Sequence, residues 1–173
     1  MYQVDDQDTV VELSDLPQSS VGAPIPMIVE GERRTIVAYY VKQHDPEWDG
    51  TTVRVVGADS EDELVAIVRF DAYATMFGPP NDEAFSGHPL AARGLRPYGF
   101  FEVLDSSWIR SLEKMNSVHP YHRKAEFLSR YRHFVLSFHD TTLECIASGF
   151  DLLETRTGSV IDAIAVRVGS FAD

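Results

Sequence analysis

The sequence predicts a single α+β domain built on a mainly antiparallel sheet, with two or three helices and a long Gly/Pro-rich loop. Its length of 173 residues suits one domain, and its content of 44% hydrophobic and 24% charged residues is that of an ordinary globular protein. Short apolar segments alternate with turn residues, which predicts neighbouring antiparallel strands. Residues 78–99 contain four glycines and four prolines, which predicts the long loop.

The N-terminal arm, residues 1–20, is acidic. It contains five Asp or Glu residues and no Lys or Arg, so we expect it to be partly mobile. Within this arm, only residues 10–13 are apolar enough to pair into a sheet. We therefore divide the chain into this arm and a single α+β domain over residues 21–173.

In the first half of the domain we expect a meander of strands. Four segments have the alternation and the β-branched content of strands: 27–29, 35–41, 51–56 and 64–70. The short connections between them favour antiparallel neighbours. Residues 71–77 predict a short helix, which the Gly-Pro-Pro sequence that follows would end.

The second half alternates between strands and helices. The expected elements are a strand over 98–104, a helix over 107–116, a helical turn over 125–131, and strands over 132–139 and 142–147. Asp105 or Ser106 is a suitable N-cap for the first helix. Residues 159–168 fit either a helix or a strand, and we favour the helix.

The 78–99 loop has two interpretations. Long connections in compact domains are often lids or binding loops. Alternatively, the loop packs its own apolar side chains, Phe85, Leu90 and Leu95, over an open face of the sheet. Both interpretations can hold together.

Charge is sorted along the chain. The net charge of −12 argues against binding to nucleic acid or to an anionic membrane, because both require a cationic surface. Residues 1–92 hold 17 acids and 5 bases, whereas residues 93–132 hold 4 acids and 8 bases. The bases of this basic segment, 93–132, could be solvated or paired with the acidic flanks. Alternatively, they help to bind an anionic small molecule or a partner protein, for which the candidate residues are His88, Arg93, Arg96 and Tyr98.

One candidate catalytic pair comes from strand phasing near the C-terminus. Pairing Phe138 with Cys145 keeps the apolar side chains on one face and sets His139 opposite Glu144. A carboxylate beside an imidazole can act as an acid–base pair. The same geometry also fits a polar cross-strand pair on the exposed face of a hairpin. Glu102, which projects among aromatic residues, is a third catalytic candidate.

Two histidines are candidate metal ligands. His119 and His122 flank Pro120 and could chelate a divalent metal across a turn, although His-x-x-His alone is a weak signal. His133 and His139 share a strand face but lie roughly 20 Å apart, too far to bind one ion. We predict no cofactor, and consider a divalent metal only together with catalysis. The sequence lacks the Gly-rich, Walker, Gly-x-Ser-x-Gly, His-Glu-x-x-His and Cys-x-x-Cys motifs.

These observations favour a noncatalytic ligand- or protein-binding accessory domain, whose ligand is an anionic small molecule or a partner protein near the 78–99 loop and the basic segment. The alternative is a hydrolase or isomerase that uses the His139 and Glu144 pair. The single cysteine, Cys145, and the lack of a membrane-length apolar run or signal peptide predict a soluble cytoplasmic protein. A homodimer formed between acidic and basic surfaces is a further alternative.

Overall fold

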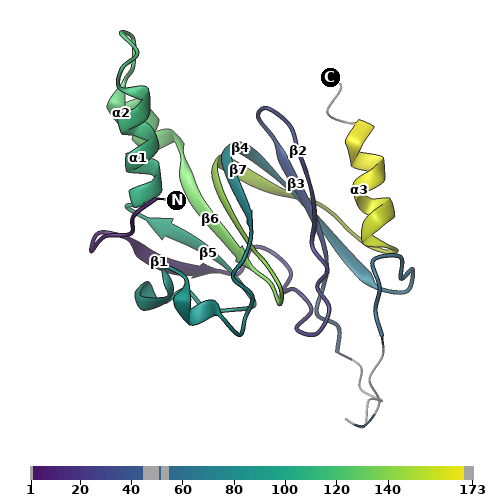
Figure 1. Ribbon diagram of the computed structural model, residues 1–173. Helices are drawn as coiled ribbons and strands as arrows, with labels where there is room; N and C mark the ends of the chain where they lie inside the picture. Colours follow the sequence, from purple (N-terminus) through teal and green to yellow (C-terminus); the bar gives the residue numbers. More distant parts are fainter. Residues whose placement is uncertain (1, 45–50, 52–54, 170–173) are drawn as a thin grey trace.

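The computed structural model describes residues 2–44, 51 and 55–169. In this part of the chain, one seven-stranded antiparallel sheet combines with three α-helices, as the predicted α+β class requires (Figure 1). The elements are β1 (Thr9–Leu13), β2 (Met27–Glu30), β3 (Thr35–Tyr40), β4 (Leu64–Gly78), β5 (Gly99–Leu104), α1 (Ser107–Asn116), α2 (Lys124–Arg130), β6 (Arg132–Ser137), β7 (Thr142–Thr157) and α3 (Val160–Val168). Among the described residues, no helix has the length and apolar character needed to cross a bilayer.

The sheet joins two three-stranded meanders. Its strand order is β1-β5-β6-β7-β4-β3-β2, so β2-β3-β4 and β5-β6-β7 meet where β4 pairs with β7. These two strands are 15 and 16 residues long. Register shifts between Ile67 and Ala74 interrupt their pairing, and irregularities of this kind bend strands. In Figure 1, α1 and α2 lie by one half of the curved sheet and α3 by the other.

Most of the expected elements are present, but the strand expected over 142–147 continues to Thr157, and one predicted element is wrong. The segment predicted as a short helix, 71–77, is the second half of β4, where Ala74 pairs with Ile146 and Phe77 with Leu143. Pairing with a strand distant in sequence here outweighs the local preference, which is common for sheets. Of the strand expected over 51–56, residues 52–54 lie outside the described residues.

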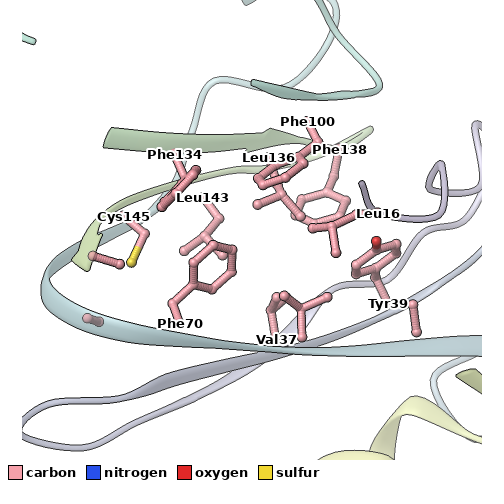
Figure 2. Packing of buried hydrophobic residues seen from close by; sticks show 14 of the residues in the cluster. Leu16, Val37, Tyr39, Phe70, Phe100, Phe134, Leu136, Phe138, Leu143 and Cys145 are labelled. Atoms are coloured by element: carbon pink, nitrogen blue, oxygen red, sulfur yellow. The ribbon is translucent and has the colours of Figure 1, made fainter. Parts of the chain in front are cut away.

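The inner face of the curved sheet carries the main hydrophobic core. Aromatic rings from opposite halves of the sheet meet there, with ring centroids of Phe70 and Phe134 5.8 Å apart (Figure 2). Phe100 and Phe150 complete this cluster with edge-on contacts. On the outer face, α3 packs against β3 and β4 through a second cluster, which explains why 159–168 forms a helix rather than a strand.

The connection between β4 and β5 covers the other part of the outer face. It contains two short 3-10 helices, 85–87 and 91–93, and its Phe85, Leu90 and Leu95 are buried against β5 and β6. Backbone groups hold it in place: the Asp82 N–H donates to the His139 carbonyl at 2.8 Å. The packing interpretation of this segment is therefore confirmed, and the segment brings its histidine and tyrosine onto the sheet.

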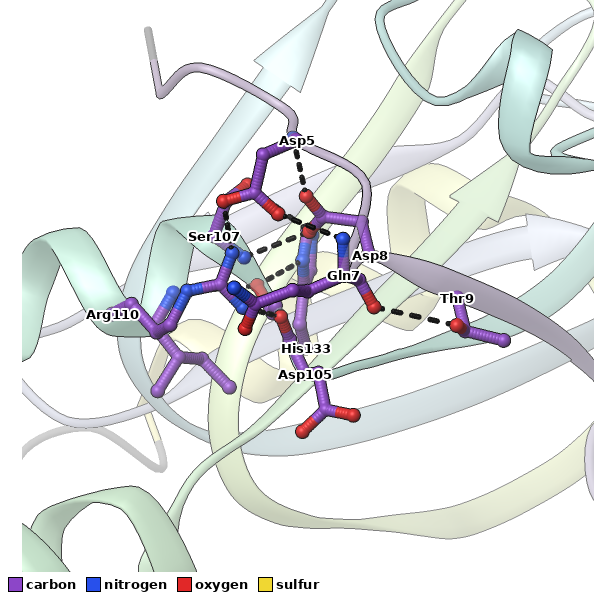
Figure 3. Close-up of polar contacts among 10 residues, drawn as sticks. Asp5, Gln7, Asp8, Thr9, Asp105, Ser107, Arg110 and His133 are labelled. Atoms are coloured by element: carbon purple, nitrogen blue, oxygen red, sulfur yellow. Dashed lines mark hydrogen bonds and ion pairs between the residues drawn. The ribbon is translucent and has the colours of Figure 1, made fainter.

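The N-terminal arm also belongs to the domain. The expected pairing of 10–13 is confirmed, because β1 pairs with β5. The Asp8 carboxylate accepts hydrogen bonds from the N–H and the hydroxyl of Ser107 at 2.7 and 3.0 Å, at the first turn of α1 (Figure 3). Arg110 Nη2 donates to Asp5 Oδ2 at 2.5 Å. Since a helix N-terminus presents unpaired N–H groups and a positive dipole, Asp8 stabilises α1.

Candidate functional site

The β6–β7 hairpin has a different register from the expected one. Cys145 pairs with Phe134, not with Phe138, and the Phe138 N–H donates to the Thr141 carbonyl at 2.9 Å. A shift of four residues keeps the apolar side chains on the same face, so the phase argument could not distinguish the two registers. His139 consequently lies in a tight turn and does not face Glu144.

Glu144 is instead the centre of a buried cluster with other partners. Its carboxylate accepts from His133 Nε2 at 3.0 Å, from His88 Nε2 at 3.4 Å and from the Tyr2 hydroxyl. The side chains of His133 and His88 are 0% and 3% exposed, and that of Glu144 is 11% exposed. The predicted polar face of the hairpin is therefore not open to solvent. It is covered by α1, the N-terminal arm and the 78–99 segment.

Each imidazole that donates to Glu144 is oriented by a second contact, made at its Nδ1 atom. The Leu90 N–H donates to His88 Nδ1 at 3.1 Å, which leaves the proton of a neutral ring on Nε2, facing the carboxylate. Ser106 Oγ lies 2.9 Å from His133 Nδ1 and also accepts from the Ile109 N–H as the N-cap of α1. Burial alone would raise the carboxyl pKa of the cluster, but the hydrogen bonds from its donors outweigh burial and lower this pKa to about 2.

A chain of hydrogen bonds joins Ser106, His133 and Glu144, which are the residue types of a catalytic triad. However, Ser106 is 2% exposed and His133 is 0% exposed, so a substrate carbonyl has no access to the hydroxyl. The hydroxyl is also used as a helix cap. The cluster is therefore a structural network that fixes the arm, α1 and the hairpin to one another.

A second cluster lies nearer the surface. The Tyr98 hydroxyl donates to Asp82 Oδ2 at 2.5 Å and lies 2.8 Å from His139 Nδ1, which is 3.3 Å from the same carboxylate oxygen. These contacts with Tyr98 and His139 lower the pKa of Asp82, whereas burial and the Asp82 carboxylate raise the pKa of Tyr98 to about 12. Tyr98 has a φ of 60°, in the left-handed region that bulky residues rarely adopt.

Tyr98 also borders a pocket of about 260 Å³. The pocket opens into the inner core between β5, β6 and the segment that follows β1. Its interior is apolar, formed by Leu16, Tyr39, Phe100, Leu136 and Phe138. Its polar lining includes Glu12, Ser14, Gln18 and Ser137. Since the turn residue His139 follows Phe138, the Asp82–Tyr98–His139 cluster lies beside this pocket.

The basic segment is largely neutralised within the chain. Five of its eight bases form ion pairs at 2.5–3.9 Å: Arg96 with Glu12, Arg110 with Asp5, Arg123 with Glu126, Lys124 with Glu113, and Arg132 with Glu102. The last pair is bidentate, so Glu102 is bound to an arginine rather than to either catalytic candidate. Arg93 is exposed on the second 3-10 turn.

The two proposed metal ligands have separate partners. His122 Nε2 lies 3.0 Å from Glu113 Oε1, and His119 Nδ1 accepts from the Tyr121 N–H at 3.2 Å. Across 2–44, 51 and 55–169, no group of three or more His, Cys, Asp or Glu side chains is arranged to hold a metal ion.

Of the predicted site residues, the structure brings together Tyr98 with His139 and, separately, His88 with Glu144. Sequence reasoning missed Asp82 and Tyr2, and it named Ser106 as a helix cap without its contact to His133. Asp82 gave no signal because its contact depends on how the 78–99 segment folds back onto the hairpin turn. His133 had a usable signal, since strand phasing placed it on the same face as Glu144. No protein-family model, curated protein or solved structure matches this chain.

Proposed function

We propose that this chain is a noncatalytic binding domain for a small, mostly apolar molecule with one hydrogen-bonding group. The ligand would occupy the pocket beside Tyr98. One observation carries the proposal: at the rim of an apolar pocket, a tyrosine is held in the left-handed region while its hydroxyl is tied to Asp82 and His139.

The strained backbone of Tyr98 supports a functional role for this residue. A bulky residue at positive φ costs about 1–3 kcal/mol and persists only where its surroundings hold it. The surroundings here are the two hydrogen bonds of the hydroxyl and the stacking of the ring on His139 at 6.2 Å. Such residues cluster at binding and catalytic sites, where a fixed side chain preorganises the site.

The pocket lining favours a neutral ligand over the anion expected from the sequence. Arg96 is paired at 2.5 Å with Glu12, which lines the pocket, and no arginine or lysine is among the described lining residues. The interior consists of aliphatic and aromatic side chains. Sites for drug-sized ligands occupy roughly 300–1,000 Å³, so a pocket of about 260 Å³ suits a molecule with a single ring.

The test is a titration with p-cresol, followed by methyl NMR of the leucines. We expect saturable shifts of the Leu13, Leu16 and Leu136 methyl groups, with a dissociation constant in the millimolar range as suits so small a ligand. Ser14→Trp, at a residue that lines the pocket, should abolish these shifts.

The matched control is Asp15→Trp, which adds the same ring at the neighbouring exposed position outside the pocket lining. This variant should bind p-cresol as the wild type does. Shifts that do not saturate, or equal loss of binding in both tryptophan variants, would contradict the proposal.

An acid–base enzyme, a hydrolase or isomerase, is the second candidate. The expected pair of His139 and Glu144 does not form, but three titratable groups do meet beside the pocket. A half-exposed imidazole that is hydrogen-bonded to a tyrosine can exchange protons with a bound substrate. Hydrolysis of p-nitrophenyl acetate should then fall in His139→Gln and stay unchanged in His119→Gln. Equal rates in both variants would reject catalysis of this ester at His139.

A cytoplasmic location belongs to the same proposal. Its support is Cys145, the single cysteine, which is buried, and burial raises its pKa to about 12, so the thiol is protonated and inert. A partner protein or a second copy held by the basic segment has less support, since five of the eight bases are paired within the chain.

A further inference from the structure

A second cleft lies beside the paired strands β4 and β7. It has a volume of about 620 Å³ and is lined by residues from four separate parts of the chain: Glu32, Arg33 and Arg34 of the β2–β3 turn, Asp71, Ala72 and Tyr73 of β4, Arg130 and Tyr131 at the end of α2, and Ser148 of β7. In Figure 1, the β2–β3 turn and α2 lie at the same end of the sheet, on either side of β4 and β7. Three arginines therefore converge on one hollow.

These arginines differ from most others in the chain. Arg96, Arg110 and Arg132 each pair with an acid at 2.5 Å. By contrast, Arg33, Arg34 and Arg130 make no ion pair within the described residues, and the Arg130 guanidinium lies 5.6 Å from the centroid of the Tyr131 ring. In a protein with a net charge of −12, three guanidinium groups without an ion pair among the described residues line the same cleft.

The lining of the cleft holds three arginines and two acids. Asp71 lies 3.7 Å from the guanidinium of Arg69, which also binds Asp151 at 2.6 Å and lies outside the cleft lining. Glu32 is exposed at the turn and makes no ion pair within the described residues, so the lining keeps a net positive charge. Guanidinium groups bind phosphate and carboxylate through paired N–H donors, and a group of three suits a doubly charged anion.

The floor of the cleft is aromatic and fixed. The rings of Tyr73 and Tyr131 lie 4.9 Å apart, and Phe127 packs edge-on against Tyr73 at 5.4 Å. The Asn116 amide donates to the Tyr73 hydroxyl at 2.6 Å, which orients that ring. Tyr73 is 38% exposed, so its side chain is partly accessible to a ligand in the cleft.

We propose that this cleft binds a phosphate monoester carried on an aromatic ring. The arginines would hold the phosphate and the tyrosines would stack with the ring. The site is independent of the pocket beside Tyr98, since the two share no lining residue. Ser14→Trp should therefore leave it unchanged.

The experiment is a titration of the full chain with phenyl phosphate at low ionic strength, followed by backbone NMR. We expect saturable shifts at residues 33, 34, 131 and 148. The double variant Arg34→Gln/Arg130→Gln should weaken binding about tenfold or more, because it removes two charge-assisted donors. Inorganic phosphate should bind more weakly than phenyl phosphate, and phenol should not bind there.

The control is Arg93→Gln/Lys114→Gln, which removes the same charge from two exposed positions outside the cleft. It should weaken binding less than about twofold, through long-range electrostatics alone. Urea unfolding of both double variants verifies that they are folded. Equal weakening in the two variants, the absence of saturable shifts, or phenol binding as tightly as phenyl phosphate would each overturn the proposal.

Discussion

At the scale of single residues, Glu144 connects four parts of the chain. Its own strand, β7, carries the carboxylate, and the donors come from β6 through His133, from the 78–99 segment through His88 and from the N-terminal arm through Tyr2. A buried carboxylate without such donors would be strongly destabilising. The cluster therefore makes the packing of these segments mutually dependent.

Replacing this carboxylate tests that dependence. Glu144→Gln places an amide N–H₂ among groups that all donate, so we expect a loss of about 3 kcal/mol in the free energy of unfolding at pH 7. Urea unfolding measures this loss of free energy. Glu126→Gln, at an exposed pair with Arg123, should change stability by less than about 1 kcal/mol. Similar losses in both variants would show that burial of Glu144 is unimportant.

The lowered pKa of Glu144 predicts a dependence of stability on pH. Its pKa is about 2 in the folded chain against an ordinary 4.5, so the contribution is present above pH 4.5 and is lost as the pH falls toward 2. The loss over that range is about 3 kcal/mol. We expect the unfolding free energy of wild type to fall more steeply than that of Glu144→Gln below pH 4.5. Parallel curves would contradict this assignment.

At the scale of elements, α1 depends on capping from outside its own segment. Ser106 supplies the local cap. Asp8 supplies a second one through Ser107, which is 99 residues away from it in sequence. The local cap was predictable because a serine directly precedes the helical pattern. The distant cap was not, because its residue belongs to an arm whose acidic composition indicated mobility.

Asp8→Ala should destabilise the chain by about 1–2 kcal/mol, since it removes a buried acceptor from the first turn of α1. Asp6→Ala is the control, at an exposed acid two residues earlier. Urea unfolding of the two variants distinguishes the cap from a general effect of charge. Equal stabilities would mean that the Asp8 carboxylate does not stabilise α1.

Side-chain phase along the strands could be predicted from the sequence, whereas strand register and strand length could not. Strand alternation located β5 and β6 and assigned the faces of β7 correctly, because side-chain phase is a local property. The hairpin register and the extension of β4 through Gly78 depended on partners elsewhere in the chain. The same limit applies to the site: Tyr98 and His139 were named separately, but their meeting with Asp82 follows from tertiary packing.

At the scale of the whole molecule, the curved sheet creates two different surfaces for binding. Its inner face closes over an aromatic core and leaves the apolar pocket at one end. Its outer face is covered by α3, α1 and the 78–99 segment. The cleft lined by Arg33, Arg34 and Arg130 lies between the β2–β3 turn and α2. Five of the eight bases in the basic segment are paired within the chain, two with the N-terminal arm and three within the segment itself, so the overall charge does not describe either site.

If the pocket beside Tyr98 receives a small neutral ligand, a crystal of the protein soaked with p-cresol should show that ligand in place. We predict ring density among Leu16, Phe100 and Phe138, with Tyr98 still at positive φ and bonded to Asp82. A pocket without density under saturating p-cresol, or with the ligand bound only elsewhere, would contradict the claim.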